Sequence, residues 1–304
     1  MIPEQELFAP GHNACAGCGP AAIARLILKA TGDNIIVVSP TGCLETFSSL
    51  YDLSSWEVPW MHPLFENGAS VASGVEAALR ILGKADIPVI VIGGDGGTYD
   101  IGMGALSGMF ERGHRITYIC YDNEAYMNTG VQRSSATPYA AATTTTPFGR
   151  RSIGEDRPKK NLAAIAIAHD VPYVATASLA YPRDLMNKVK KSLTVDGPRF
   201  ILVHSPCPVG WGFDSALTVE VSRLAVQTGL MPVYEAENGE ITKVFKIIPR
   251  PVEDFLKVQR RFKHLFTSEE GREQIELIQA AANENITKMG LAKEPGRKVK
   301  VDAS

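Results

Sequence analysis

The sequence predicts an α/β fold, in which a mostly parallel sheet carries helices on both faces. Apolar runs typical of strands that are buried on both faces lie at residues 34–39, 88–93, 116–121, 173–176 and 200–204. Stretches typical of helices alternate with them, at residues 20–30, 68–82, 103–112, 162–169 and 182–192. Because strands that alternate with helices usually form βαβ units, we expect parallel pairing.

The first half of the chain gives each element its own signal. Residues 20–30 are rich in Ala, Ile and Leu, which favours a helix after the C-x-x-C segment. An irregular segment with two tryptophans follows the first strand, at residues 50–63. The helix 68–82 has small residues on one face, which permits close packing against the sheet. The segment from residue 88 to residue 121 then reads as one βαβ unit.

A long polar stretch, residues 123–160, has little periodicity of either kind. A loop of this length in a compact domain is usually functional or disordered. We expect a functional loop, because it begins at Asn123, which is a candidate metal ligand for the reasons given below. The alternation then resumes, and the helix 182–192 tolerates Pro182 in its first turn.

The alternation weakens after residue 211, and we place a boundary at residue 235. Residues 1–235 are expected to form the main domain. Residues 236–304 are expected to form a C-terminal helical extension, with helices at 251–262 and 268–289 and an extended basic tail at 290–304. We interpret this extension as an arm that contacts partner subunits; a solvated tail is the alternative.

Bulk properties exclude several classes of protein. The net charge of −2 gives no argument for binding nucleic acid or an anionic membrane. No apolar run approaches the length of a membrane span, and the N-terminus lacks the pattern of a secretory signal. A cytoplasmic protein with reduced thiols is therefore expected, so the cysteines are read as metal ligands or reactive groups before disulfides.

The most informative segment joins a glycine-flanked carboxylate to an amide about thirty residues later. Asp95 lies between Gly94 and Gly96 after one apolar strand, and Asn123 follows the next strand. A carboxylate and an amide suit Mg²⁺, which takes six oxygen ligands and often some from a phosphate. The glycines allow close backbone approach, and a helix N-terminus favours an anion. The pattern predicts a diphosphate–Mg²⁺ clamp; a plain glycine-rich turn is the alternative.

Four of the five cysteines have positions that suit a metal centre. Cys15 and Cys18 form a C-x-x-C pair, and Cys43 and Cys207 follow predicted strands. Four thiolates can hold Zn²⁺ or an iron–sulfur cluster, and spacing alone leaves both open. A thioredoxin-like redox pair lacks the βαβ context that it needs. Cys120 lies inside an apolar strand and is expected to be a buried core thiol.

The chain resembles a known family over residues 9–235. The Asp95–Asn123 spacing is similar to the diphosphate motif of thiamine diphosphate (TPP) enzymes. The wider set of motifs resembles the β subunit of pyruvate:ferredoxin oxidoreductase, in the 2-oxoacid:ferredoxin oxidoreductase family. These motifs are HNACAGCGP, PTGCLE, GGDGGTYDIGMG, YDNEAYMNTGVQRSSATP, KKNLAAIAIAHDVPYVATAS and SPCPVGW.

The resemblance implies a TPP-binding fold and a set of site residues. The ligands of a [4Fe-4S] cluster would be Cys15, Cys18, Cys43 and Cys207. The Mg²⁺ ligands would be the side chains of Asp95 and Asn123 and the backbone carbonyl of Ala125. The other residues of the cofactor site, with Cys43 among its neighbours, would be Gly94, Gly96, Gly97, Asn128, Thr129 and Gln132. Of these, Asn128 would lie near the reactive ring and the substrate and is the catalytic candidate.

The resemblance also implies oxidative decarboxylation of pyruvate with CoA, which gives acetyl-CoA and CO₂ and sends electrons to ferredoxin. The glutamate that activates the cofactor would come from a pyrimidine-binding α-type chain, so neither Glu45 nor Glu66 is given that role. Further clusters would lie on a ferredoxin-like chain. The basic residues at 150–151, 157 and 159–160 are expected to form a solvated loop rather than a CoA site.

Other functions stay open at this point. The alternative substrates within the class are 2-oxoisovalerate, another 2-oxoacid, and oxalate without CoA. A different class is a non-redox TPP carboligase or decarboxylase, which gives no reason for four placed cysteines. A third class is a zinc-stabilised assembly module without catalysis.

Overall fold

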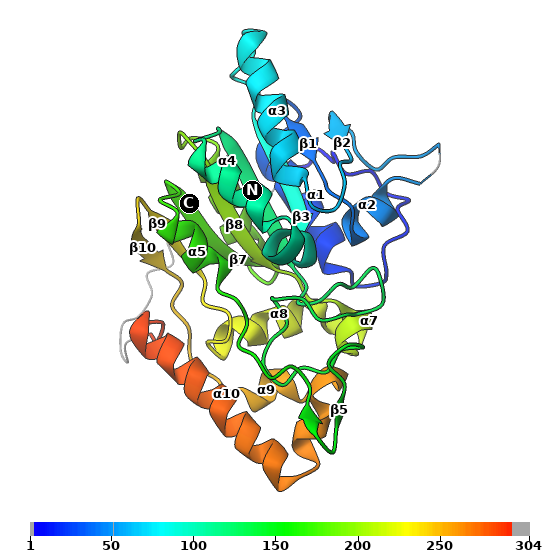
Figure 1. Ribbon diagram of the computed structural model, residues 1–304, viewed down its shortest axis with the longest axis vertical. Helices are drawn as coiled ribbons and strands as arrows, with labels where there is room; N and C mark the ends of the chain where they lie inside the picture. Colours follow the sequence, from blue (N-terminus) through cyan, green and yellow to red (C-terminus); the bar gives the residue numbers. More distant parts are fainter. Residues whose placement is uncertain (1–2, 51, 294–304) are drawn as a thin grey trace.

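A computed structural model describes residues 3–50 and 52–293, and an eight-stranded sheet lies at its centre. The strands are β1 Ile36–Val38, β2 Trp60–Met61, β3 Val89–Gly94, β4 Ile116–Asp122, β7 Tyr173–Ser178, β8 Arg199–His204, β9 Tyr234–Glu237 and β10 Glu240–Val244. Their order is β10-β9-β7-β8-β4-β3-β1-β2 (Figure 1). All neighbouring strands from β7 to β2 in this order pair in parallel. Strand β9 pairs antiparallel with both of its neighbours, β7 and β10. The predicted mostly parallel α/β fold is confirmed.

Helices cover both faces of this sheet. They are α1 Gly19–Thr31, α2 Cys43–Ser48, α3 Gly68–Ile81, α4 Met103–Glu111, α5 Leu162–Ala168, α6 Pro182–Ser192, α7 Pro208–Trp211, α8 Thr218–Gln227, α9 Glu253–Leu256 and α10 Glu269–Lys288. Helices α3, α4, α5 and α8 pack on one face, and α1 and α6 pack on the other. The described part of the chain contains no helix with both the length and the apolar character of a membrane span.

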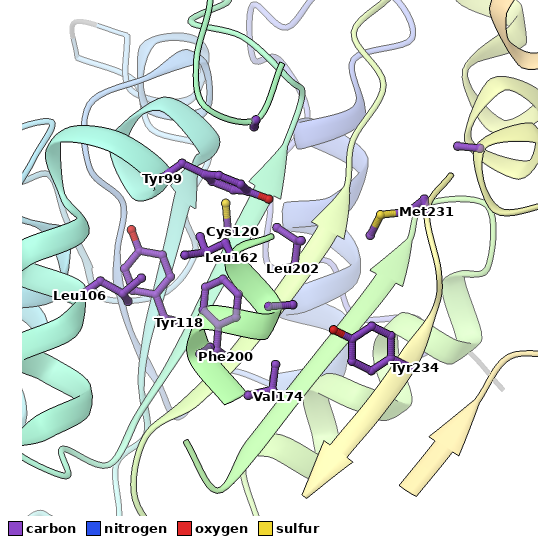
Figure 2. Close-up of a cluster of buried hydrophobic side chains, with 14 of the residues drawn as sticks. Tyr99, Leu106, Tyr118, Cys120, Leu162, Val174, Phe200, Leu202, Met231 and Tyr234 are labelled. Carbon is purple, nitrogen blue, oxygen red and sulfur yellow. The ribbon is translucent and has the colours of Figure 1, made fainter. Parts of the chain in front are cut away.

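The larger core layer lies between the sheet and α3, α4 and α5 (Figure 2). The rings of Tyr118 and Phe200 stack there, with centroids 6.2 Å apart. Cys120 lies between them and Tyr99, and its side chain is fully buried. Cys120 is therefore a core thiol, as expected.

The polar stretch 123–160 is largely irregular, as its sequence predicts. Its only paired strands in the described residues are the two-residue β5 Phe148–Gly149 and β6 Ser152–Ile153. Backbone hydrogen bonds order it, including Tyr126 N–H to Gln132 O at 2.9 Å and Ala142 N–H to Arg261 O at 3.0 Å. The second bond joins this loop to the C-terminal part of the chain.

The C-terminal part differs from expectation in two ways. The boundary expected at residue 235 falls inside β9, so the sheet continues beyond it. The helix expected at 251–262 is two short turns, α9 and the 3₁₀-helix η3 Arg260–Phe266, whereas α10 matches the expected 268–289 closely. Side chains of α9, η3 and α10 join the main core layer. The basic tail lies mostly in residues 294–304, outside the described part.

Glu235 of β9 makes a testable contribution to stability. Its buried carboxylate accepts hydrogen bonds from Tyr173 Oη at 3.0 Å, Lys191 Nζ at 2.8 Å and Lys243 Nζ at 3.1 Å. Burial opposes the charge, but the hydrogen bonds from Lys191, Lys243 and Tyr173 outweigh it and lower the pKa of Glu235 from 4.5 to about 2. Because the folded pKa is the lower one, this stabilisation is complete above the unfolded pKa and disappears as the pH falls toward 2.

Glu235→Gln should lower the free energy of unfolding at neutral pH by about 1–3 kcal/mol, since it weakens charged hydrogen bonds in a buried place. The difference between wild type and variant should shrink by about half or more near pH 3, as measured by urea unfolding. Glu237→Gln is the matched control, because Glu237 shares Lys191 but its side chain is 39% exposed. Equal losses in the two variants would contradict the prediction.

Candidate active site

The carboxyl ends of neighbouring parallel strands meet at one edge of the sheet, where open α/β sheets usually place their ligands. Gly94 of β3 pairs with Tyr121 of β4, and Asp122 of β4 pairs with His204 of β8, so these strands end at the same level. The predicted site residues that follow the strand ends are Cys43, Asp95, Asn123 and Cys207.

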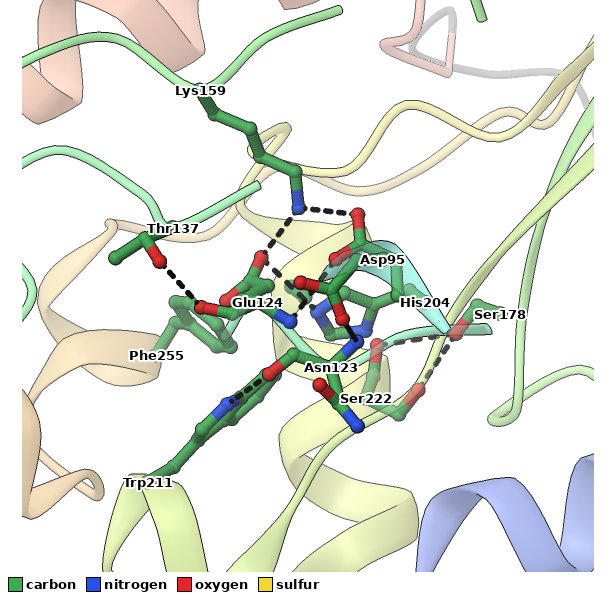
Figure 3. Close-up of polar contacts among 12 residues, drawn as sticks. Asp95, Asn123, Glu124, Thr137, Lys159, Ser178, His204, Trp211, Ser222 and Phe255 are labelled. Atoms are coloured by element: carbon green, nitrogen blue, oxygen red, sulfur yellow. Dashed lines mark hydrogen bonds and ion pairs between the residues drawn. The ribbon is translucent and has the colours of Figure 1, made fainter. Parts of the chain in front are cut away.

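Asp95 and Asn123 lie close together at this edge (Figure 3), and the carbonyl of Ala125 lies beside the Asn123 amide. One terminal atom of the Asn123 amide lies 2.8 Å from Oδ1 of Asp95 and 2.9 Å from the carbonyl oxygen of Ala125. If that atom is the amide nitrogen, it donates to both oxygens. If the amide is turned so that its oxygen takes this position, Asp95, Asn123 and Ala125 present three acceptor oxygens together. Adjacent oxygen ligands of octahedral Mg²⁺ lie about 3 Å apart, because each lies about 2.1 Å from the metal. The predicted Mg²⁺ ligands thus have a spacing that fits the ion.

Asp95 is an unfavourable place for an uncompensated charge. Its side chain is almost fully buried and accepts hydrogen bonds from Ser134 Oγ at 2.6 Å and from Asn123 N–H at 3.3 Å. Burial, together with the nearby charge of Asp122, raises the pKa of Asp95 well above its usual range. A divalent cation beside Asp95 would offset this penalty.

The glycines around Asp95 are required by close packing. Gly96 and Gly97 begin a π-helix, η1 Gly96–Ile101, which the sequence did not predict. A Cβ on Gly96 would lie 2.3 Å from the ring of Tyr126, and one on Gly97 would lie 2.9 Å from the carbonyl oxygen of Phe65. Single π-turns are often found at functional sites. Contact of Gly94, Gly96 and Gly97 with a diphosphate stays a prediction.

The turn that follows Asn123 is strained. Glu124 is buried and has a φ of +69°, a conformation that costs a non-glycine residue about 1–3 kcal/mol. Its N–H donates to Asp122 Oδ1 at 3.1 Å, and its carbonyl accepts from Thr137 Oγ1 at 2.8 Å. The turn brings the carbonyl of Ala125 back to the Asn123 amide.

Two cations hold the Glu124 carboxylate, one on each oxygen. Lys159 Nζ lies 2.8 Å from Oε1, and Arg261 Nη2 lies 2.6 Å from Oε2. The contact of Lys159 with Glu124 is visible in Figure 3, and Lys159 also lies 2.6 Å from Asp122 Oδ2. Burial opposes the charge on Glu124, but Lys159 and Arg261 outweigh it and lower its pKa to about 2. Sequence reasoning missed Glu124 and Arg261, which are 137 positions apart.

The prediction that the basic residues form a solvated loop is wrong for Lys159 and Lys160. Lys159 belongs to the buried cluster below the turn, and Lys160 donates to the carbonyl of Tyr99 and lies 3.7 Å from Asp100. Arg157, by contrast, is 72% exposed and lies in solvent as expected. The loop therefore contributes lysines to the protein's own carboxylates.

Trp211 joins the turn to the cationic cluster. Its side chain is fully buried, and its Nε1 donates to the carbonyl of Asn123 at 2.8 Å. The guanidinium of Arg261 lies over its ring, 3.8 Å from the centroid. The buried ring of His204 packs against Trp211 with centroids 5.4 Å apart. Trp211 thus supports the backbone of a predicted metal ligand.

The residues expected near the reactive ring and substrate lie on an exposed turn after Ala125. Asn128 and Thr129 are exposed, and Gln132 is half-buried. Thr129 Oγ1 donates to Gln132 Oε1 at 2.5 Å, and Gln132 Nε2 donates to Thr129 O at 2.8 Å. The turn is thus ordered by its own hydrogen bonds, and the catalytic role of Asn128 stays a prediction.

The cysteine segments lie side by side although they are far apart in the sequence. The turn with Cys15 and Cys18 packs against the segment that leads to Cys207, since a Cβ on Gly19 would lie 2.7 Å from the carbonyl oxygen of Pro206. Cys18 precedes α1, Cys43 begins α2 and Cys207 precedes α7, so three thiols stand at helix starts.

The thiols also affect one another's protonation. Burial, followed by the neighbouring thiols, raises the pKa of both Cys18 and Cys43 to about 12. Burial raises the pKa of Cys207 as well, although the N–H of Gly210 donates to its Sγ at 3.3 Å. Cys15 is the exposed member of the group. Cys18, Cys43 and Cys207 would become thiolates readily only with a positive centre beside them.

Within residues 3–50 and 52–293, no three His, Cys, Asp or Glu side chains come together closely enough to hold a single metal ion. The Mg²⁺ ligands predicted here include an amide and a backbone carbonyl, which lie outside that set. The four cysteines belong to that set, so the cluster stays a prediction from the sequence. The Mg²⁺ ion stays a prediction too, and the oxygen donors described above support it.

Comparisons with known proteins identify the family. Residues 40–203 match the family described as thiamine pyrophosphate enzyme, C-terminal TPP binding domain. The chain is 60% identical over 278 residues to the pyruvate synthase subunit PorB of Methanosarcina barkeri, covering 91% of this chain and 94% of that protein. It is 47% identical over 286 residues to the ketoisovalerate oxidoreductase subunit VorB of Pyrococcus furiosus, covering 91% and 90%.

The chain belongs to this family of TPP-dependent oxidoreductase subunits. The resemblance seen in its motifs and the predicted enzyme class are thereby confirmed. The matched residues 40–203 include Cys43, Asp95 and Asn123 but exclude the other three candidate cluster ligands.

A solved structure supports the fold. The 2-oxoglutarate:ferredoxin oxidoreductase from Magnetococcus marinus superposes with a TM-score of 0.58 at 23% identity, covering 73% of this chain and 80% of that chain. At this level of identity the similarity concerns the fold alone.

Proposed function

We propose that this chain is the TPP-binding subunit of a pyruvate oxidoreductase that also uses Mg²⁺ and a [4Fe-4S] cluster. The reaction converts pyruvate and CoA to acetyl-CoA, CO₂ and a proton. It reduces two one-electron carriers at the same time. One observation carries the proposal: a terminal atom of the Asn123 amide lies 2.8 Å from Asp95 Oδ1 and 2.9 Å from the Ala125 carbonyl oxygen, in a chain 60% identical to a pyruvate synthase subunit. The amide oxygen in that position would complete a set of three ligands for a cation.

The chain's own residues would bind and orient the cofactor. Asp95, Asn123 and the carbonyl of Ala125 would hold Mg²⁺ against the diphosphate, and the N–H groups that begin η1 would face that diphosphate. Bound TPP would supply the carbon nucleophile for a 2-oxoacid carbonyl and the electron sink for loss of CO₂. Asn128, on the exposed turn, would then contact the substrate side.

Four cysteines would hold the cluster, whose chemistry is one-electron transfer. Cys18, Cys43 and Cys207 are partly buried and Cys15 is exposed, so the cluster would be reachable from one side only. Ferredoxin, or a ferredoxin-like subunit, would receive electrons on that side. This assignment requires reduced thiols, in keeping with the cytoplasmic setting expected from the sequence.

Partner chains complete the proposal. A pyrimidine-binding α-type chain would contribute the glutamate that activates the cofactor, and residues 236–304 would contact partner subunits on their outer face. The isolated chain should therefore be inactive. Full activity of the purified single chain would contradict this part of the proposal.

A second candidate substrate is 2-oxoisovalerate, because the chain is also 47% identical to a ketoisovalerate oxidoreductase subunit. The test is an anaerobic dye-reduction assay of the native complex with pyruvate, 2-oxobutyrate, 2-oxoisovalerate, 2-oxoglutarate and oxalate, each with and without CoA. We expect CoA-dependent reduction with the highest kcat/KM for pyruvate. Turnover of oxalate without CoA, or a preference for the branched acid, would overturn the substrate assignment and keep the cofactor assignment.

Metal analysis of the same complex separates the other classes. Iron and acid-labile sulfide in equal amounts, with bound TPP, are the expected result. TPP without iron would favour a non-redox carboligase or decarboxylase, and stoichiometric zinc without thiamine would favour an assembly module.

A further inference from the structure

We propose that Arg261 is a positioning residue for the metal-binding turn: it holds Glu124 in the left-handed conformation and so fixes the Ala125 carbonyl and the Asn123 backbone. The inference rests on the proposed Mg²⁺–TPP site. Arg261 contacts Glu124, Gln259 and Trp211, so its role is to support the ligands.

The first contact acts on the strained residue. Glu124 is held by its N–H, its carbonyl and both carboxylate oxygens, and Arg261 takes the oxygen that Lys159 does not. Lys159 is also bound to Asp122, on the strand before the turn. Arg261 is therefore the cation that joins Glu124 to the C-terminal part of the chain. Without it, one oxygen of a buried carboxylate would lose its partner, and the left-handed backbone would lose a restraint.

The second contact acts on the other side of the turn. The guanidinium of Arg261 lies flat over the Trp211 ring, and the indole N–H of that ring donates to the Asn123 carbonyl. One side chain thus supports the turn through Glu124 and through Trp211. Both supports must be in place for the Asn123 amide to stay within 2.8 Å of Asp95.

Arg261 comes from the C-terminal part of the chain, so this part contributes to the interior of the protein. Arg261 is 6% exposed and begins η3 together with Arg260, and its Nε donates to Gln259 Oε1 at 2.8 Å. Its carbonyl accepts from the N–H of Ala142 in the long loop. The segment expected to serve only as an arm for partner subunits therefore supports the cofactor site of its own chain.

The test is a titration of the full chain, in its native complex, with Mg²⁺ at saturating TPP, followed by calorimetry. Arg261→Met should weaken Mg²⁺ binding by about 10–100-fold, as changes behind metal ligands commonly do. Hydrogen exchange of the backbone amides of residues 123–126 should become faster. Arg260→Met is the matched control, since Arg260 is the same residue type, adjacent and exposed, and its affinity should equal that of wild type.

Two further variants keep the inference testable. Arg261→Lys retains the charge without the planar fork, and it replaces the methionine variant if that one fails to fold; a several-fold loss of affinity is expected. Asparagine tolerates positive φ, so Glu124→Asn combined with Arg261→Met should bind Mg²⁺ more tightly than Arg261→Met alone.

The outcomes distinguish this inference from the proposed function. Unchanged Mg²⁺ affinity in Arg261→Met and Arg261→Lys, even with a lower melting temperature, would show a merely structural role and overturn the inference alone. Failure of the wild-type complex to bind Mg²⁺ with TPP would overturn the proposed function and, with it, this inference.

Discussion

Replacing Asp95 by alanine is expected to abolish binding of Mg²⁺ and TPP while leaving the iron content unchanged. Asp95 is the only charged member of the proposed ligand set, and its loss should reduce Mg²⁺ affinity by more than about 100-fold, beyond the effect of supporting residues. Calorimetry with TPP and Mg²⁺ measures this directly, and oxidation of 2-oxoacids should disappear with it.

Although replacing Asp95 should weaken cofactor binding, we expect it not to weaken the stability of the cofactor-free chain. Burial and Asp122 raise the pKa of Asp95, so this carboxyl makes the folded, cofactor-free chain less stable at a pH where the unfolded chain ionises it. Asp95→Asn should therefore leave the cofactor-free chain as stable as wild type or more stable, as measured by urea unfolding. Asp86→Ala is the matched control, because this exposed carboxylate lies just before the amino end of the same strand. Normal TPP content in Asp95→Ala would contradict the Mg²⁺ assignment.

Replacing Cys18 by alanine is expected to remove the cluster. Its thiol is mostly buried, stands before α1 and has its pKa raised by burial and by the charges of Cys207 and Cys15, as expected for a thiol that needs a metal partner. Iron and sulfide should fall by the content of one cluster per copy of this chain, the visible absorption of the complex should decrease in proportion, and dye reduction should stop. Binding of TPP should be weakened far less.

Cys120→Ala is the control for this change. Cys120 is fully buried in β4 and lies in the core, so its loss should destabilise the chain by about 1 kcal/mol through a small cavity and leave the iron in place. Full iron content in Cys18→Ala would exclude Cys18 as a ligand. Loss of iron in both variants would point to a general weakness of the fold rather than to a ligand.

Buried parallel strands could be predicted closely, because they read as continuous apolar runs. Residues 88–93 and 116–121 match β3 and β4 within one residue at each end. The edge strand β10 and its neighbour β9 were missed because they carry charge: Glu235 in β9 is buried beside its lysine partners, and β10 is largely exposed. Charged residues in an edge strand conceal the alternation on which a prediction depends.

The proposed metal ligands of the site could be predicted from the sequence, but the residues that support those ligands could not. Asp95 and Asn123 stand directly after strands, so local pattern was enough to find them. Lys159, Trp211 and Arg261 meet the turn only through the folded chain, and no periodicity connects positions so far apart. The π-helix η1 was missed for a related reason, since glycine-rich sequence does not distinguish a turn from a wide helix.

The place of Arg261 late in the chain bears on how the protein matures. A ribosome adds about 5–20 residues per second, so the strands that precede Asp95 and Asn123 are made several seconds before Arg261. Until residue 261 has been released and packed, the left-handed turn lacks its last restraint. Cofactor loading should therefore follow completion of the chain, and a nascent chain stalled before residue 261 should not retain Mg²⁺ and TPP.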